Sequence, residues 1–462
     1  MNPLYLSVAI GVLLGLVYAL SPLTVWFAFA MIALLRWSGR GLPDAERRWI
    51  QWLLLAAIAA RIAAIAGLFL ATDHARVPFG SFFGDEEYFI KRSLWLRNVA
   101  LGIPIHRADL IYAFDDYSYT SYLYVLALLQ VLFGPAPYGL HLFGAALYLA
   151  GAVLLFRVVR PSLGPVTAFG GLALLLFLPS LFAWSISALK EPLYFAIAAG
   201  TLAATVRAVR EPRWKTRLAL TIAIALAAVV MQTIREGGLA IAAGGIVGGL
   251  VLAALSLRPR IAWALIFVAP FVVMLAWRVP DVQIASWRAV RQVAKVHWGH
   301  IQTAGYTYKV LDDRFYRERS SIDSMDRGEV LRYLIRAGVA YVIVPLPWKI
   351  ESRAAFSYVP EQMVWFLMLA LAPLGIMSGT RRDPLVTWLL VAFALAAALP
   401  VALTSGNVGT LVRHRGLAVP FVAWLGAAGA AELAARLGRR SYPIDSAAVP
   451  SAAAKVERYA LD

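Results

Sequence analysis

The chain has 462 residues, of which 61% are hydrophobic and only 15% are charged. These proportions exclude an ordinary soluble domain, in which about one quarter of the residues are charged. The apolar residues fill repeated segments instead of one core, and inside a bilayer such segments must be helices or strands of a closed barrel. Uninterrupted runs of Leu, Ala, Val and Ile favour helices, so the sequence predicts an all-α polytopic membrane protein.

The formal net charge of +17 is consistent with a membrane protein. No basic stripe with interleaved aromatic residues lies outside the apolar segments, so we expect membrane lipids and not nucleic acid as partners. Lys and Arg gather instead in connectors, as they do in cytoplasmic loops and beside lipid phosphates. Cysteine is absent, which excludes disulfides and thiolate chemistry.

Apolar segments follow one another along the whole chain and predict about 11–13 spans. The segments at 22–36 and 119–133 are short, and we interpret them as half-helices or tilted packing elements. The first segment has no basic residue before it, so it is expected to be a retained span and not a cleaved signal. In chain order the segments are 3–20, 22–36, 49–71, 119–133, 138–157, 164–183, 191–207, 217–234, 238–257, 260–277, 361–379, 384–404 and 414–436.

Basic connectors orient these segments, because short cytoplasmic loops are enriched in Lys and Arg. The cytoplasmic set comprises Arg207, Arg210, Arg213, Lys215, Arg217, Arg258, Arg260, Arg381, Arg382, Arg436, Arg439 and Arg440. Alternation then places four regions outside: the turns at Lys190 and Arg235, the long segment 278–360, and the connector 405–413. Cytoplasmic arginines at 36–48 would likewise place the long segment 72–118 outside.

The first third of the chain contains a conflict. The arginines at 36–48 and those at 157–160 should all be cytoplasmic, yet two predicted spans separate residue 72 from residue 157. One of the two must fail to cross. We expect 119–133 to be the exception, because it is short and begins with polar residues.

The chain contains no linker, low-complexity tract or convincing internal repeat. We therefore expect a single transmembrane domain over 1–440 and a disordered cytoplasmic tail over 441–462, which is rich in Ala, Ser and Pro. The expected location is the inner (plasma) membrane, with several passes.

The first long segment carries three consecutive acids, Asp85, Glu86 and Glu87. They either decorate a solvated loop or provide a carboxylate at the membrane surface that deprotonates an acceptor hydroxyl. An amphipathic interfacial helix is expected to follow, with Trp95, Leu96 and Val99 opposite Lys91, Arg92 and Arg97. Asp115 and Asp116 are either solvated or supply a second acid or a metal ligand.

Charged residues also mark the ends of three later segments. Lys190 and Glu191 begin one, where Glu either caps the helix or binds substrate. Arg235 lies between two others, as an ordinary ion-pair partner or beside a substrate path.

A glycine-rich turn near the C-terminus leads into Arg413, His414 and Arg415. Two arginines outside a span break the charge rule for a short loop, so they either reach toward headgroups or bind a lipid phosphate. His297 and His300 share the spacing of a metal pair but lack an acidic ligand pattern. Gly244 with Gly248 and Gly245 with Gly249 predict close helix packing. No glycine-rich phosphate loop followed by Lys appears, which excludes an ATP motor in this chain.

The acidic motif in the first outer loop, the many spans and the late basic motif together resemble the C-type (GT-C) glycosyltransferase superfamily. Residues 345–348, Pro360 with Glu361, the segment GNVGTLVRHR and Pro420 resemble membrane proteins of bacterial polysaccharide-assembly clusters. The resemblance covers most of the chain through short motifs.

This resemblance implies a polyprenyl-phosphate-linked sugar donor, an extracytoplasmic glycan or lipid acceptor, and transfer with inversion. It implies that Asp85 is the general base, with Glu86 as its alternative or partner. Arg413 and Arg415 would hold the donor phosphate. The further substrate-binding candidates are Lys190, Glu191, Arg235 and His414. No cofactor is certain, and a divalent cation stays open.

Two rival functions remain. A polysaccharide polymerase or ligase would use a glycan linked to a lipid pyrophosphate and would depend mainly on Arg413, His414 and Arg415. A transporter or flippase of lipid-linked sugars is the alternative from another class. Two long outer loops are more than a carrier needs, and no inverted halves with broken helices are evident.

Overall fold

A computed structural model describes residues 3–76, 84–115, 120–135, 138–301, 309–311, 325–346, 356 and 358–441. These residues form 19 helices and no strand, so the all-α polytopic fold is confirmed. Eight helices are long and apolar enough to cross a membrane, and two bent helix pairs raise the number to ten. The remaining expected spans are three shorter apolar helices. The expected tail beyond residue 441 lies outside the described residues.

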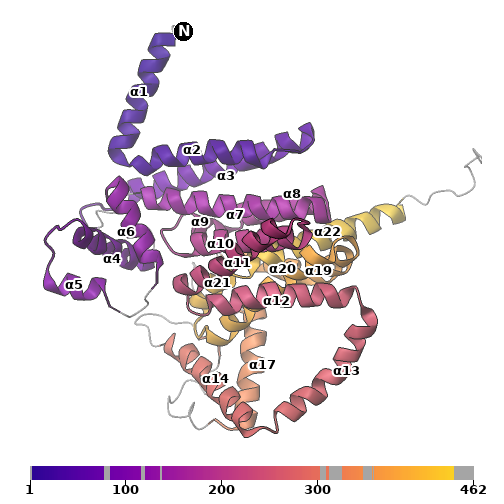
Figure 1. The fold of residues 1–462 in the computed structure, drawn as a ribbon. Helices are drawn as coiled ribbons and strands as arrows, with labels where there is room; N and C mark the ends of the chain where they lie inside the picture. The colour runs from indigo at the N-terminus through magenta and orange to yellow at the C-terminus, as the bar shows by residue number, and fades with distance from the viewer. Residues whose placement is uncertain are drawn as a thin grey trace, which may run out of the picture.

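The first half of the chain places α2, α3, α7 and α8 side by side, while α1 projects from the bundle and α4 to α6 lie at one end of it (Figure 1). These helices are α1 (Pro3–Leu20), α2 (Pro22–Ser38), α3 (Asp44–Ala71), α4 (Gly84–Ala100), α5 (Arg107–Ala113), α6 (Tyr122–Phe133), α7 (Gly139–Leu163) and α8 (Pro165–Phe177).

The second half adds the remaining spans and a second group of helices outside the bundle, α14 and α17 (Figure 1). These helices are α9 (Pro179–Ser185), α10 (Glu191–Arg210), α11 (Trp214–Ile234), α12 (Gly238–Ser256), α13 (Pro259–Ala276), α14 (Pro280–Gly299), α17 (Arg327–Ile343), α19 (Val359–Arg382), α20 (Pro384–Thr404), α21 (Val408–Arg415) and α22 (Val419–Ser441). The pairs α8/α9 and α21/α22 bend by 65° and 64°.

Glycines bring α12 and α20 into close contact, as their spacing predicted. A Cβ at Gly245 would lie 2.7 Å from the ring of Phe393, and one at Gly249 would lie 2.8 Å from the Cα of Leu389. Small residues let membrane helices approach closely, where dispersion replaces the missing hydrophobic drive.

Replacing Gly249 by Ala should therefore destabilise the bundle by about 1–3 kcal/mol, because the added methyl meets backbone. Gly200→Ala on α10 is the matched control, since a Cβ there meets no atom within 4 Å. The measurement is the thermal midpoint of helix loss in detergent. Equal midpoints for the two variants would contradict this packing.

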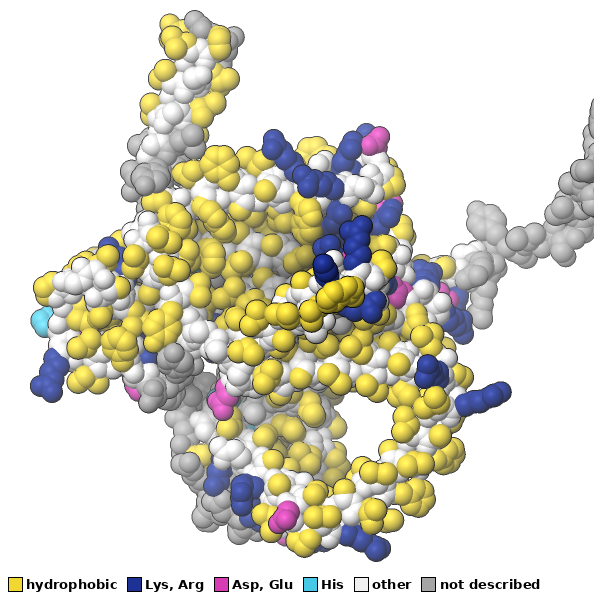
Figure 2. Space-filling view, in the orientation of Figure 1, with side chains coloured by type: hydrophobic (Ala, Val, Ile, Leu, Met, Phe, Trp, Pro, Cys, Tyr) yellow, Lys and Arg dark blue, Asp and Glu magenta, His cyan; other side chains and the backbone are white. Residues whose placement is uncertain are grey.

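One end of the bundle collects the basic connectors. Arg157 Nη1 donates to the carbonyl of Trp37 at 2.9 Å, and Arg160 binds both carboxylate oxygens of Glu46 at 2.9 Å. At the same end Arg210 pairs with Asp383. Figure 2 shows Lys and Arg side chains concentrated toward the right-hand end of the bundle. We call this the basic end.

Helix α6 stays at the opposite end. Its 12 residues span about 18 Å, well short of the hydrocarbon thickness of about 30 Å. The residue before it, Ser121, donates its backbone N–H to the carbonyl of Thr233 at 2.9 Å, and Gln130 donates to Ser93 of α4 at 2.6 Å. Because α6 packs on α4 instead of crossing, α3 and α7 can both reach the basic end, which removes the conflict in orientation.

The expected amphipathic pattern of α4 is wrong at two positions. Arg92, assigned to the polar face, is fully buried and donates to the carbonyls of Ala113 and Asp115 at 3.2 and 2.5 Å. Val99, assigned to the apolar face, is exposed. The helix packs against α5 and α6 instead of presenting one face to lipid, so its burial follows tertiary contacts and not periodicity.

The second long segment also returns to the end opposite the basic connectors. Asn407 donates its side-chain N–H to the carbonyl of His300 at 2.8 Å, and Val310 donates to the carbonyl of Gly406 at 3.0 Å. A Cβ at Gly406 would lie 1.8 Å from the carbonyl oxygen of His297, so only glycine permits this approach. The described parts of segments 72–118 and 278–360 therefore meet the turns at 190, 235 and 405–413 at one end, which we call the site end.

Candidate functional site

Glu86 fixes the first turn of α4 at the site end. Its side chain is fully buried. One carboxylate oxygen accepts from the Ala188 backbone N–H at 2.8 Å, and the other lies 3.1 Å from His141 Nε2. Tyr122 donates to the Ala188 carbonyl at 3.1 Å, so the backbone N–H and the carbonyl of Ala188 are both hydrogen-bonded to side chains. Glu86 thus positions α4, and it leaves the neighbouring Asp85 facing outward.

Asp85 forms an ion pair with Arg413, which lies 328 residues later in the chain. The Asp85 side chain is 64% exposed, whereas that of Arg413 is 29% exposed. The exposed carboxylate of Asp85 can be approached from solvent. Arg413 is set deeper, so the pair spans the boundary between the water-facing surface and the interior.

Arg413 also reaches a buried acid. Its Nη2 lies 3.3 Å from Glu191 Oε1, and Arg235 Nη1 lies 3.7 Å from the same oxygen. Glu191 is only 1% exposed and begins α10, while Arg235 follows the end of α11. Two guanidinium groups therefore share one carboxylate where α10, α11 and α21 meet at the site end. Intramembrane-edge charges of this kind mark functional sites more often than stability elements.

Three polar atoms in this cluster have no hydrogen-bond partner among the described residues. They are Glu191 Oε2, Arg413 Nε and the hydroxyl of Tyr194, all buried. Leaving such groups unpaired costs about 1–3 kcal/mol each. Donors and acceptors that are buried and unmatched are what a ligand with both kinds of polar group would satisfy.

Sequence reasoning missed Tyr194. It lies three residues after Glu191 on α10, a spacing that puts both side chains on one face of the helix. That spacing was the signal available in the sequence.

Lys190 adds a third cation beside Glu191. Burial, and then the nearby guanidinium of Arg235, lower the pKa of Lys190 to about 8. The ammonium of Lys190 is therefore still charged at neutral pH, but it loses its proton at a pH only slightly above neutral. We call Asp85, Lys190, Glu191, Arg235 and Arg413 the charged cluster.

The turn before α21 positions Arg413 beside Asp85 and Glu191. Asn407 caps the helix by accepting the Thr410 backbone N–H at 2.6 Å, and Gly406 permits the close contact with α14. A short helix that begins at a fixed cap sets the direction of each following side chain.

Arg415 points away from the charged cluster, although the sequence suggested that it acts together with Arg413. It is 1% exposed and donates to Gln362 Oε1 at 2.8 Å and to the Tyr341 carbonyl at 2.7 Å. Its guanidinium also stacks 5.1 Å from the Trp365 ring. These contacts tie α21 to α17 and α19, so Arg415 acts as a packing residue.

The remaining candidate residues are three histidines and two aspartates. His414 is half-buried, with its ring 6.4 Å from that of His300. His297 and His300 each place Nδ1 near a backbone carbonyl, at 3.2 and 2.7 Å. Burial lowers the pKa of His297 to about 4, so it is neutral at physiological pH. Asp115 is exposed, and Asp116 lies outside the described residues. Among the described residues no three metal-ligand side chains gather.

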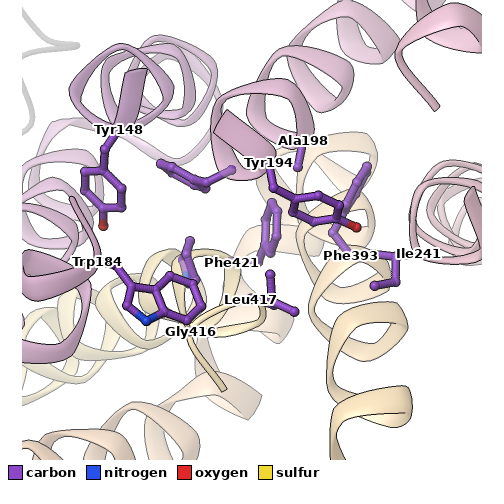
Figure 3. A pocket seen from close by; sticks show the side chains of 11 residues that line it. Tyr148, Trp184, Tyr194, Ala198, Ile241, Phe393, Gly416, Leu417 and Phe421 are labelled. Atoms are coloured by element: carbon purple, nitrogen blue, oxygen red, sulfur yellow. The ribbon is translucent and has the colours of Figure 1, made fainter. Parts of the chain in front are cut away.

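A small cavity lined by aromatic residues adjoins the charged cluster at Tyr194. Figure 3 shows Tyr194 and Phe421 beside this cavity, with Trp184 lying near Gly416. Tyr194 belongs to both regions, because its ring lines the cavity while its hydroxyl approaches Arg235. The site end therefore places polar charge immediately above an apolar aromatic wall.

Comparisons with known proteins identify no relative: no family model, no curated protein and no solved structure matches this chain. The arrangement itself can bind an anion through three cations and can accept a proton on an exposed carboxylate, with aromatic side chains packed beside it.

Proposed function

We propose that the protein is a membrane glycosyltransferase that moves a sugar from a polyprenyl-phosphate donor to a glycan or lipid acceptor at the site end. The observation that carries this proposal is the Asp85–Arg413–Glu191 chain of contacts, in which one arginine links an exposed carboxylate to a buried one. The site end would face the extracytoplasmic side of the inner (plasma) membrane, because the basic end collects the Arg-rich connectors.

The ion pair between Asp85 and Arg413 suggests how donor and acceptor chemistry are coupled. A donor phosphate that takes the guanidinium of Arg413 releases Asp85 from its partner. The freed carboxylate can then accept a proton from an acceptor hydroxyl. Lys190 and Arg235 would complete the anion site from α10 and α11.

The transfer step balances without a further reactant. The acceptor hydroxyl oxygen attacks the anomeric carbon, and Asp85 takes the hydroxyl proton. The bond between the anomeric carbon and the phosphate oxygen breaks, and the polyprenyl phosphate leaves with the electron pair. Attack from the opposite face inverts the anomeric centre. Charge that develops on the phosphate is stabilised by Arg413, Arg235 and Lys190.

The direct test is a transfer assay in liposomes. The reconstituted protein is supplied with radiolabelled polyprenyl-phosphate sugars, one sugar at a time, and with a native-membrane glycan and lipid extract as acceptor. Label should move from the donor lipid to the acceptor fraction for at least one sugar. Transfer from nucleotide sugars alone would contradict the proposal.

A polymerase or ligase that uses a lipid-pyrophosphate-linked glycan is the second candidate. Three cations, Lys190, Arg235 and Arg413, exceed what one monoanionic phosphodiester needs, and this observation favours a pyrophosphate. Repeating the assay with a radiolabelled lipid-pyrophosphate-linked glycan as the donor separates the two, because only the second function consumes that donor.

The state of Lys190 predicts a pH dependence of anion binding. Because its pKa in the folded protein is about 8 and not the usual 10.5, it loses its charge as pH rises from 7 to 9. Affinity for a short-chain polyprenyl phosphate in neutral liposomes should therefore fall several-fold over this range. The ligand phosphate is already mostly dianionic at pH 7, so its own titration does not explain a fall.

Lys190→Gln should flatten this profile and bind as weakly at pH 7 as the parent does at pH 9. Lys91→Gln is the matched control, because Lys91 forms an exposed pair with Glu87 on the same side of the protein. An unchanged pH profile in Lys190→Gln would exclude Lys190 from the anion site.

A further inference from the structure

A second basic pocket lies at the basic end, between α7 and α10. Its volume is 290 Å³, and Arg157, Arg207 and Arg210 line it. Arg207 lies 16 residues after Glu191 on the same helix, or about 24 Å along its axis. The pocket is therefore separate from the charged cluster.

The charges around this pocket are only partly neutralised. Arg210 pairs with Asp383. Arg157 donates to the carbonyls of Trp37, Ser38 and Arg40, and neither it nor Arg207 forms an ion pair within the described chain. The one acid in the lining, Glu211, turns its carboxylate to the backbone N–H of Arg213 at 3.2 Å. A net positive charge remains.

The wall of the pocket is apolar. Val158 of α7 and Ala203 and Val206 of α10 line it beside the arginines. Both helices are long and apolar enough to span a membrane. The pocket thus combines a cationic rim with an aliphatic surface at the ends of α7 and α10. Basic pockets between the ends of spans recognise anionic headgroups.

We propose that this pocket binds the phosphate headgroup of an anionic phospholipid, with the acyl chains lying along the groove between α7 and α10. Arg207 is the main free cation, because Arg157 and Arg210 are also held by protein partners. Guanidinium groups contact phosphate oxygens in a two-pronged geometry. The aliphatic wall favours a lipid over a soluble phosphate, which would leave that surface unused.

The test is native mass spectrometry of protein released from mixed micelles of phosphatidylglycerol and phosphatidylcholine. The parent should retain phosphatidylglycerol in preference. Arg207→Glu should reduce that retention at least about five-fold, the scale of one interfacial charge. Arg48→Glu is the matched control, since Arg48 is exposed at the start of α3 at the same end but outside the pocket. It should retain the lipid as the parent does.

An equal loss in Arg207→Glu and Arg48→Glu, or no preference in the parent, would overturn the proposal. Displacement of the lipid by millimolar inorganic phosphate would instead assign the pocket to a soluble phosphate and would also overturn it. Arg207→Gln guards against misfolding of the charge-reversed variant, and it should give a smaller loss in the same direction.

Discussion

Replacing Asp85 by Asn is expected to slow sugar transfer by a factor of at least about one hundred while leaving lipid-phosphate binding intact. Asn has nearly the same shape but cannot take the proton of an acceptor hydroxyl. Because Asp85 is exposed, its ion pair with Arg413 adds little to stability. Loss of that pair leaves Arg413 more available, so the variant should bind polyprenyl phosphate at least as tightly as the parent.

Two neighbouring acids provide the controls for Asp85. Glu87→Gln removes a carboxylate from the same turn of α4, where it pairs with the exposed Lys91, and it should change transfer by less than about two-fold. Glu86→Gln disturbs a buried contact with Ala188 and should act on stability. Near-parent transfer in Asp85→Asn would exclude Asp85 as the base, and inactivity of a well-folded Glu86→Gln would move the role there.

Replacing Arg413 by Ala is expected to lower kcat/KM by at least about one hundred-fold and to weaken donor binding as well. The leaving phosphate gains charge as the glycosidic bond breaks, so a contact that strengthens at that moment lowers the barrier itself. Arg413→Lys should lose at least about ten-fold, since an ammonium cannot reproduce a two-pronged contact. Steady-state kinetics with the labelled donor measures both effects.

Arg413→Ala can also lose activity through lower stability, because it leaves the buried carboxylate of Glu191 without its nearest guanidinium. Glu191 then keeps the longer contact with Arg235 at 3.7 Å, and a poorly compensated buried charge is destabilising. The double variant Arg413→Ala with Glu191→Gln restores the charge balance. It should recover the thermal midpoint of the parent but not its turnover. Recovery of turnover in the double variant would contradict a role in binding phosphate.

The membrane architecture was largely predictable because hydrophobicity along a helix is a local property. Every predicted span corresponds to a helix or a bent helix pair, and Gly245 and Gly249 pack as their spacing indicated. The predicted amphipathic faces of α4 were wrong at Arg92 and Val99 for a clear reason. Helix α4 is buried by α5 and α6, and such tertiary contacts leave no periodic signal in the sequence.

The sequence predicted the individual residues of the charged cluster as candidates, but it did not predict their contacts with one another. Lys190, Glu191, Arg235 and Arg413 stood out as charges near the ends of spans, and Asp85 stood out in the acidic run of the first long segment. Contacts between residues hundreds of positions apart have no sequence signature. Their common location follows from the topology, which brings these regions to one end.

The pairing of Arg413 with Arg415 failed for a local reason. Residues two apart on a helix do not face each other, and α21 is a helix from Val408 to Arg415. A separate short helix before the last span was not expected, because the predicted span began at 414. The two-residue offset on α21 directs Arg413 toward Asp85 and Glu191, and Arg415 toward α17 and α19.

The most direct test of the charged cluster is the affinity of a fluorescent short-chain polyprenyl phosphate for the parent, Asp85→Asn and Arg413→Ala in neutral liposomes at pH 7. If Arg413 exchanges Asp85 for the phosphate, Asp85→Asn should bind at least as tightly as the parent, and Arg413→Ala at least about ten-fold more weakly. Equal affinities in all three proteins, or a loss in Asp85→Asn as large as that in Arg413→Ala, would contradict this exchange.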